Sequence, residues 1–224
     1  MTASPDVHLN ADFAQRVCID TQAMAWQSSP SATVWRKRLH LDGPPEAGRV
    51  TSVVRYDPNS SFPAHGHPQG EEILVLSGVF SDNQGNWGPG SYLLNPEGFS
   101  HAPFSEGGCI IFVKLKQYPG TQQLAIDSAR LKWQPSEAPG IRAKSLFVSA
   151  ELPEVMDLEQ FAGGIGGITR AYPRGAEIFV LEGDLTESGR SLGPGTWLRL
   201  PPGAAHTLGS HAGGTIFIKQ NHLA

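Results

Sequence analysis

The chain of 224 residues contains 26 glycines and 18 prolines, so nearly one residue in five interrupts regular helices, which excludes a helical bundle. The formal net charge of −4 gives no general attraction to phosphate backbones, which excludes nucleic acid as an expected partner. No apolar run approaches the roughly 20 residues that span a bilayer, and the first twenty residues lack the basic and apolar regions of a signal peptide. We therefore expect a cytoplasmic protein with no membrane partner.

Short segments rich in Val, Ile, Leu and aromatic residues follow one another along the chain. In the first half they cover residues 50–56, 71–80, 92–95 and 109–115, and Gly, Pro, Asn and Asp residues separate them. This spacing is typical of antiparallel strands in a sandwich or barrel. The sequence therefore predicts an all-β protein.

An internal repeat organises the chain. Residues 65–114 align without a gap with residues 170–219, and 19 of these 50 positions are identical. Upstream the offset between the repeats changes from 105 to 107 residues, a difference that a loop can absorb. Each repeat has the size of a domain, which predicts two homologous domains, residues 1–117 and 118–224. Residues 154–161 allow a helix, but their equivalents in the first repeat have a strand pattern, so we expect a strand in both.

Two closely spaced histidines mark a candidate metal site in the first repeat. His65 and His67 stand two positions apart, so in an extended strand both rings project from the same face. Glu71 follows after a short turn, and His101 comes thirty residues later, after turn residues. Three neutral imidazoles and one carboxylate suit a divalent first-row metal such as Zn, Fe, Mn, Ni or Cu.

These residues also carry a family resemblance. The run from His65 to Glu71, with Gly78 beyond it, resembles the first cupin motif, and the run from Gly90 to His101 resembles the second. In cupins the two motifs lie on neighbouring strands of a jelly-roll barrel and bind one metal inside it. The resemblance therefore implies two tandem cupin (RmlC-like) jelly-roll barrels, a bicupin, with His65, His67, Glu71 and His101 as metal ligands.

The residue pattern of the first motif is similar to that of the cupin domain in ChrR-type anti-sigma factors. The resemblance covers both repeats, but those regulators place a helical, zinc-binding anti-sigma domain before the cupin, and this sequence lacks its signature. A sigma factor is therefore not expected to bind by that known surface. Glu72 competes with Glu71 as a ligand. The distance to Gly78 favours Glu71, and Glu72 is expected to be structural or to support the ligands from outside.

The second repeat has lost most of the site. At the positions of His65, His67, Glu71 and His101 it carries Arg170, Tyr172, Ala176 and His206, while the glycines and prolines of the turns remain. We expect a degenerate site that binds no metal in a domain kept for packing. The alternative is that Arg170, Tyr172 and His206 line a pocket for an anionic ligand. The other histidines, which have no partners at ligand spacing, are expected at the surface: His8, His40, His211 and His222.

Three functions follow from this site. The resemblance alone favours a regulatory or sensor module related to anti-sigma factors that regulate transcription. The first alternative is a dioxygenase that acts on a small diketone or hydroxyketone, with Phe62, Phe104 and Phe112 shaping the pocket. The second alternative is a structural metalloprotein. The sequence identifies no catalytic residue.

The expected cofactor is one divalent metal ion per chain. The resemblance favours zinc, and iron, manganese and nickel also suit the ligands. A small-molecule ligand and a protein are possible partners, and exposed sheet edges make a homodimer plausible.

Overall fold

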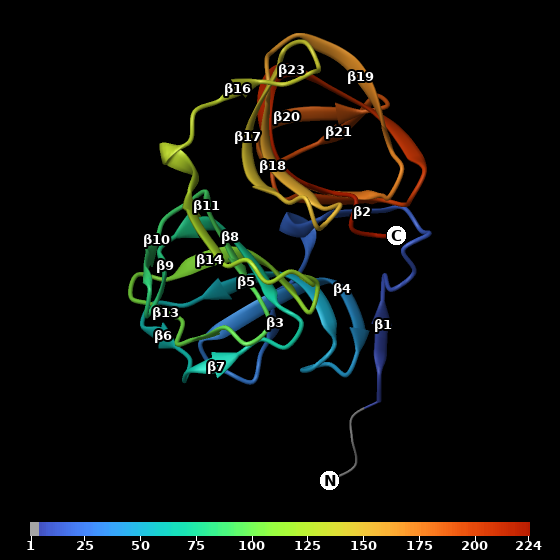
Figure 1. Ribbon diagram of the computed structural model, residues 1–224. Coiled ribbons are helices and arrows are strands. Elements are labelled where there is room, and N and C mark those ends of the chain that lie inside the picture. Colours follow the sequence, from blue (N-terminus) through green and yellow to red (C-terminus); the bar gives the residue numbers. More distant parts are fainter. Residues whose placement is uncertain (1–4) are drawn as a thin grey trace. The chain divides into compact units, whose positions relative to one another are not determined.

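The computed structural model describes residues 5–224, which fold almost entirely into β-strands (Figure 1). The all-β prediction is confirmed. The chain divides into two compact units. The first unit consists of the residues up to Ala11 together with Met24–Arg130, and the second consists of Asp12–Ala23 together with Leu131–Ala224.

The first unit is a barrel of antiparallel strands. Its large sheet has the order β1 (Val7–Leu9), β4 (Val34–Gly43), β5 (Arg49–Tyr56), β14 (Cys109–Leu115), β8 (Glu71–Gly78), β11 (Ser91–Asn95) and β15 (Leu124–Asp127), with β3 (Gln27–Ser28) beside β4. A smaller sheet has the order β10 (Gly85–Trp87), β9 (Phe80–Asp82), β13 (Phe104–Ser105) and β6 (Ser60–Ser61). The pair β7 (His65–Gly66) and β12 (Ser100–His101) completes the barrel.

Alternate side chains of these strands fill the barrel interior. Ile73 and Val75 of β8 belong to one buried apolar cluster, whose other members include Val34, Tyr56, Phe80, Leu93, Cys109, Ile111 and Val113. Because successive side chains of a strand project from opposite faces, Glu71 shares the interior face with Ile73, and Glu72 lies on the other face. The parity of β8 thus directs one carboxylate of the Glu71–Glu72 pair into the barrel.

The second unit repeats this arrangement in one bent sheet. Its order is β16 (Gln134–Pro135), β17 (Ile141–Val148), β18 (Val155–Phe161), β23 (Ala204–Gln220), β20 (Ala176–Glu187), β22 (Thr196–Leu200) and β2 (Val17–Asp20). β19 (Ile165–Tyr172) pairs with β23, and β21 (Arg190–Leu192) pairs with β20. The strand expected near residues 154–161 is present as β18.

Each repeat gives one strand from near its N-terminal end to the sheet of the other repeat. β2 precedes the first barrel in the chain, yet it pairs with β22 of the second unit. The equivalent strand of the second repeat, β15, pairs with β11 of the first unit. Each of these strands leads into a single-turn 3₁₀ helix, η1 (Thr21–Ala23) or η2 (Ser128–Arg130). The compact units therefore differ from the continuous domains 1–117 and 118–224 by these exchanged segments.

The recurring glycines have a steric explanation at the end of β8. Gly78 has a φ of +71°, and a Cβ atom there would lie 2.1 Å from the carbonyl oxygen of Gly108. Its repeat equivalent Gly183 has a φ of +84° and the same 2.1 Å clearance from the carbonyl oxygen of Gly213. Both positions combine a left-handed backbone with a close backbone approach, so only glycine fits.

We expect Gly78→Ala to destabilise the protein by about 1–3 kcal/mol or more, because strain at a left-handed position adds to the backbone clash. The measurement is chemical or thermal denaturation followed by circular dichroism. Gly88→Ala is the matched control, because a Cβ there meets nothing within 4 Å and φ is outside the left-handed region. Equal stability of the two variants would contradict the steric explanation.

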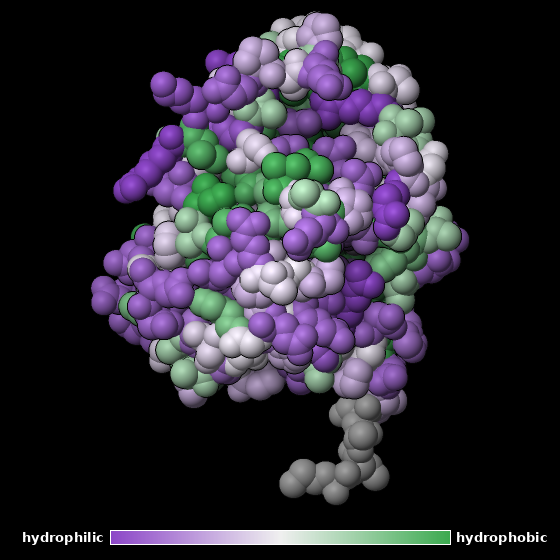
Figure 2. Space-filling view, in the orientation of Figure 1, coloured by the Kyte–Doolittle hydropathy of each residue, from purple (hydrophilic) through white to green (hydrophobic). Residues whose placement is uncertain are grey.

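Hydrophilic residues predominate on the face of the molecule shown in Figure 2. Within residues 5–224 no helix has the length and apolar character needed to cross a membrane. Two histidines that we expected at the surface are buried instead. His40 is fully buried, and the ring of His222 is only 2% exposed. His8 is exposed and pairs with Asp42.

Candidate metal centre

Two short strands and one tight turn bring the predicted ligands together. His65 on β7 and His101 on β12 are direct register partners in an antiparallel pair. The turn after His67 closes with a hydrogen bond from the amide of Gly70 to the carbonyl of His67 at 3.1 Å. Gly70 has a φ of +77°, and a Cβ atom there would lie 2.7 Å from the carbonyl oxygen of Tyr118. This turn begins β8 with Glu71 facing the histidines.

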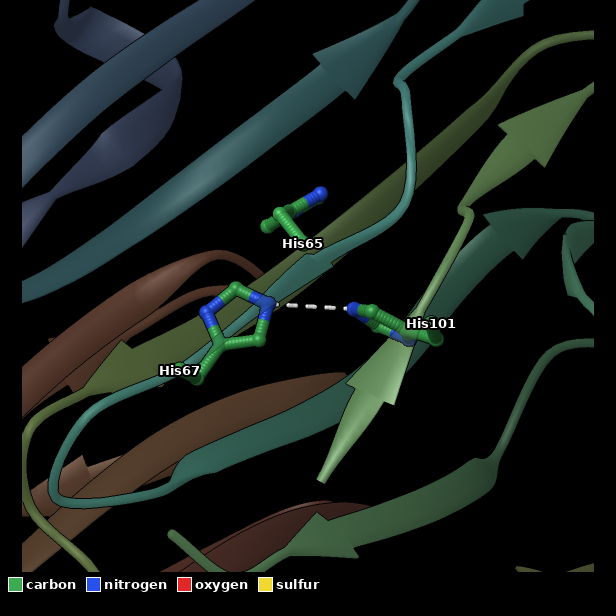
Figure 3. Close-up of side chains that lie close together, drawn as sticks. All are labelled: His65, His67 and His101. Carbon is green, nitrogen blue, oxygen red and sulfur yellow. Dashed lines mark hydrogen bonds between the residues drawn. The ribbon is translucent and has the colours of Figure 1, made fainter. Parts of the chain in front are cut away.

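The side chains converge on one point inside the first barrel. The Nε2 atoms of His67 and His101 are 3.1 Å apart, and the ring of His65 lies beside both (Figure 3). One ring nitrogen from each of the three histidines falls within a 4.8 Å group. The carboxylate of Glu71 lies 3.5 Å from Nε2 of His67 and 3.4 Å from Nε2 of His101. Three imidazole nitrogens and one carboxylate are a donor set that fits a first-row divalent metal.

Other polar groups contact the predicted ligands on the side away from the centre of the site and orient them. Nδ1 of His101 lies 3.2 Å from Oδ2 of the buried Asp82, and Nδ1 of His65 lies 2.7 Å from the carbonyl oxygen of Pro63. Both contacts leave Nε2 of the ring directed at the centre of the site. The side-chain amide of Asn95 donates a hydrogen bond of 3.0 Å to Glu71. Such outer contacts fix the tautomer and orientation of metal-binding histidines.

The electrostatics of the site favour a cation. Burial raises the pKa of Glu71, which shows that the carboxylate lacks solvation inside the barrel. Burial lowers the pKa of His67 to about 3, so this ring is neutral at physiological pH. Burial alone would lower the pKa of His101, but the hydrogen bond with Asp82 and the charges of Glu71 and Asp82 raise it instead. A metal ion would provide the positive charge that these buried carboxylates need.

The two adjacent glutamates have separate roles. Glu71 faces the histidines, whereas Glu72 lies on the opposite face of β8 and accepts a hydrogen bond from Tyr92 at 3.3 Å. The parity of β8 thus separates Glu72 from the carboxylate that faces the histidines.

The three phenylalanines expected to shape the pocket lie on different faces of the barrel sheets. Phe62 packs against the core of the barrel, and its ring centroid is 5.9 Å from that of His65. The neighbours of Phe112 on β14, Ile111 and Val113, occupy the interior face, so Phe112 lies on the other face. Phe104 pairs with Ser81, whose neighbour Phe80 belongs to the interior cluster, so Phe104 also lies on the other face.

Sequence reasoning missed three residues around the histidines. The ring centroid of Phe99 lies 5.6 Å from that of His101, and the centroid of Phe80 lies 6.2 Å from it. Asp82 is the third, and the repeat held a signal for it. Its equivalent is Glu187, an acid that lies 3.5 Å from the surviving histidine of the second repeat, His206.

We expect Asp82→Asn to weaken metal binding by about 10–100-fold, the usual effect of removing a carboxylate that orients a metal-bound histidine. Competition of the purified protein with a metal chelator at fixed pH measures this change. Glu187→Gln makes the same change beside His206 and should leave the affinity as it is. An unchanged affinity in Asp82→Asn would show that Asp82 does not position His101.

The second unit fills the equivalent space with its own ion pairs. Nη1 of Arg170 lies 2.7 Å and 2.8 Å from the two carboxylate oxygens of Glu159. Glu187 contacts Arg16 as well as His206. The ring of Tyr172 lies 5.3 Å from that of His206 between centroids. The charge of Arg170 is thus matched by Glu159 within the unit, and an anion-binding role of Arg170, Tyr172 and His206 stays a prediction.

Comparisons with known proteins agree with this geometry. The family model described as the ChrR cupin-like domain matches residues 14–119 and again residues 121–224. The chain belongs to the ChrR cupin-like family. Its two halves are thus both cupins, and the predicted fold of two tandem cupin barrels is confirmed. No curated protein matches the sequence.

Solved structures of cupin-like shape resemble the whole bicupin. A candidate dioxygenase from Nostoc punctiforme is 16% identical with a TM-score of 0.74, over 94% of this chain and 84% of the other. Pirin YhhW from Escherichia coli, solved with nickel(II), is 11% identical with a TM-score of 0.66, over 94% and 100%. An oxalate decarboxylase OxdC variant from Bacillus subtilis is 11% identical with a TM-score of 0.66, over 92% and 77%. At these identities the likeness extends to the fold.

Proposed function

We propose that the first barrel binds one divalent metal ion through His65, His67, Glu71 and His101, and that the protein is a metal-dependent oxygenase of a small oxygen-chelating molecule. The observation that carries this proposal is the convergence of three histidines and one carboxylate inside the barrel. Four protein ligands leave two positions of an octahedral metal open. Iron, manganese or nickel bound in this way supplies Lewis-acid and redox chemistry to a ligand in those positions.

The chain itself shapes access to these positions. His65 is partly exposed, whereas His101 is buried, so a ligand would approach from the side of His65. Phe62, Phe80 and Phe99 place apolar rings around the histidines and would exclude water from that approach. Asp82 and Asn95 would hold His101 and Glu71 in place while the ligand binds. A small β-diketone or hydroxyketone, which chelates through two oxygens and has an apolar body, suits such a pocket.

A second candidate is a regulatory module whose metal site senses a small molecule. The family match, which spans both halves and carries the ChrR name, favours it. In this case the aromatic lining would bind an effector, and the readout would be a change in binding to a protein partner.

Oxygen consumption separates the two candidates. The full-length chain is loaded with iron(II) and supplied with a panel of β-diketones and hydroxyketones. Turnover of about 1–1000 per second supports the oxygenase. Ligand-induced change in the metal spectrum without oxygen consumption supports the regulatory module. A metal-loaded protein that does neither would contradict both, and would leave a structural metalloprotein with zinc held by all four ligands.

A further inference from the structure

A group of charged residues lies on the interior face of the first barrel without a role in metal binding. β4 carries Val34, Arg36 and Arg38 at alternating positions, so all three side chains project from one face. Val34 belongs to the interior cluster of the barrel. The side chains of Arg36 and Arg38 are only 17% and 16% exposed. Two guanidiniums therefore lie largely buried on the face that also holds the metal site.

A carboxylate of the same chain already occupies these guanidiniums. Glu46, on the loop between β4 and β5, accepts hydrogen bonds from Arg36 at 2.8 Å and 2.5 Å and from Arg38 at 3.0 Å. Its side chain is 50% exposed, so this carboxylate reaches inward from the surface. One carboxylate balances two guanidiniums, which leaves one positive charge, and Nε of Arg36 is buried without an acceptor. The cluster thus has the charge and the donors for a further anion.

Strand register relates this cluster to the metal site. Arg36 pairs with Val54 on β5, so their side chains lie about 5 Å apart at Cβ. The second repeat indicates which residue lies opposite the side chain of Val54. Its equivalent Glu159 contacts Arg170, which stands at the position of His65. By this equivalence Val54 would face His65, which is partly exposed, and Arg36 lies on the neighbouring strand.

The second repeat, which has lost the metal ligands, has lost this cluster too. The equivalents of Arg36 and Arg38 are Ala143 and Ser145. The register pair Leu41–Val50 is equivalent to Val148–Val155, and the connection between the paired residues, which carries Glu46 in the first repeat, is residues 42–49 there and residues 149–154 in the second. The arginines and the connection that is longer by two residues thus occur only in the barrel that retains the histidines.

We propose that Arg36 and Arg38 form a carboxylate-binding subsite for the ligand of the metal site, and that Glu46 occupies this subsite until an anionic ligand displaces it. The proposal rests on the proposed function, because it assigns a charge to the small molecule that chelates the metal. The ligand class is an oxygen chelator with a carboxylate at the end remote from the metal. The contacts that Glu46 makes with Arg36 and Arg38 are those that this carboxylate would make on binding.

Two matched probes test the subsite. Heptane-2,4-dione and 4,6-dioxoheptanoate share one β-diketone skeleton, and the second carries a carboxylate, remote from the diketone, in place of a terminal methyl group. Each is titrated into the full-length cobalt(II)-loaded protein, and the dissociation constant is read from the visible spectrum. We expect 4,6-dioxoheptanoate to bind at least about 10-fold more tightly, as hydrogen bonds between charged groups allow.

Three variants identify the residues responsible. Arg36→Met/Arg38→Met should abolish the preference for 4,6-dioxoheptanoate, and Glu46→Gln should increase it severalfold while leaving heptane-2,4-dione binding unchanged. Arg142→Met, which removes an exposed arginine of the second unit, should behave as wild type. Metal content and melting temperature verify folding, and Glu46→Gln keeps the test decisive if the double variant fails to fold.

The outcomes distinguish this inference from the proposed function. Equal binding of the two probes by the wild type, or a preference that survives loss of both arginines, would overturn the subsite and leave an open metal site in place. A spectrum that responds to neither probe would overturn the open metal site and the subsite together.

Discussion

A chain in which His65 and His67 are both replaced by alanine will purify with less than about one tenth of a metal ion, whereas the wild type will carry about one. Removing a carboxylate that merely orients a ligand already weakens binding by about 10–100-fold, so the loss of two donors should exceed about 100-fold. The site then retains Glu71 and His101, which are too few donors to compete with water. Elemental analysis of protein purified without added metal gives this result directly.

The second repeat supplies the control for this experiment. His206→Ala removes the histidine equivalent to His101 from a unit where Arg170 and Tyr172 have replaced the other two. This variant should keep the full metal content. Loss of metal in His206→Ala, or about two ions per wild-type chain, would show that the second barrel also binds metal. Full metal content in the His65/His67 variant would place the metal elsewhere in the chain.

Replacing Glu159 by valine should destabilise the second unit by about 3 kcal/mol, because it leaves the mostly buried Arg170 without its carboxylate. The side chain of Glu159 is 6% exposed and that of Arg170 is 20% exposed, which places the effect near the lower end for buried pairs. Calorimetry should record it as a lower melting temperature, by several degrees.

The first barrel shows how this loss can be reversed. It has Val54 and His65 at the positions of Glu159 and Arg170. The double variant Glu159→Val/Arg170→His removes both charges and should regain most of the stability that Glu159→Val loses. A double variant less stable than Glu159→Val alone would mean that Arg170 has a further partner in the barrel.

The four ligands could be predicted from the sequence because they lie in two short motifs with fixed spacing. Strand parity then separates Glu71 from Glu72, and the spacing to Gly78 had favoured the same residue. Asp82 was overlooked because it stands in a segment of turn-forming residues, where an acid has an ordinary explanation. Its position beside His101 depends on where the barrel places β9 and β12, and no local sequence pattern encodes that placement.

Side-chain orientation was less accessible to sequence reasoning. The face of β14 on which Phe112 lies could not be predicted, because the strand is apolar at both parities and hydrophobicity does not identify its interior face. His40 was expected at the surface because it has no metal-ligand partner, but it lies in the buried stretch Leu39–Leu41 of β4. The pairing partners of β2 and β15 could not be predicted either, because strand periodicity does not specify which sheet a strand joins.

The exchange of β2 and β15 bears on how such a chain arose and on how it can be cut. A protein with one copy of the repeat would have an open sheet position where the partner's exchanged strand belongs, and two copies would fill each other's gap. Gene duplication and fusion would convert such an obligate pair into a single polypeptide. Expressing either half alone would therefore yield a barrel with an exposed sheet edge that self-associates.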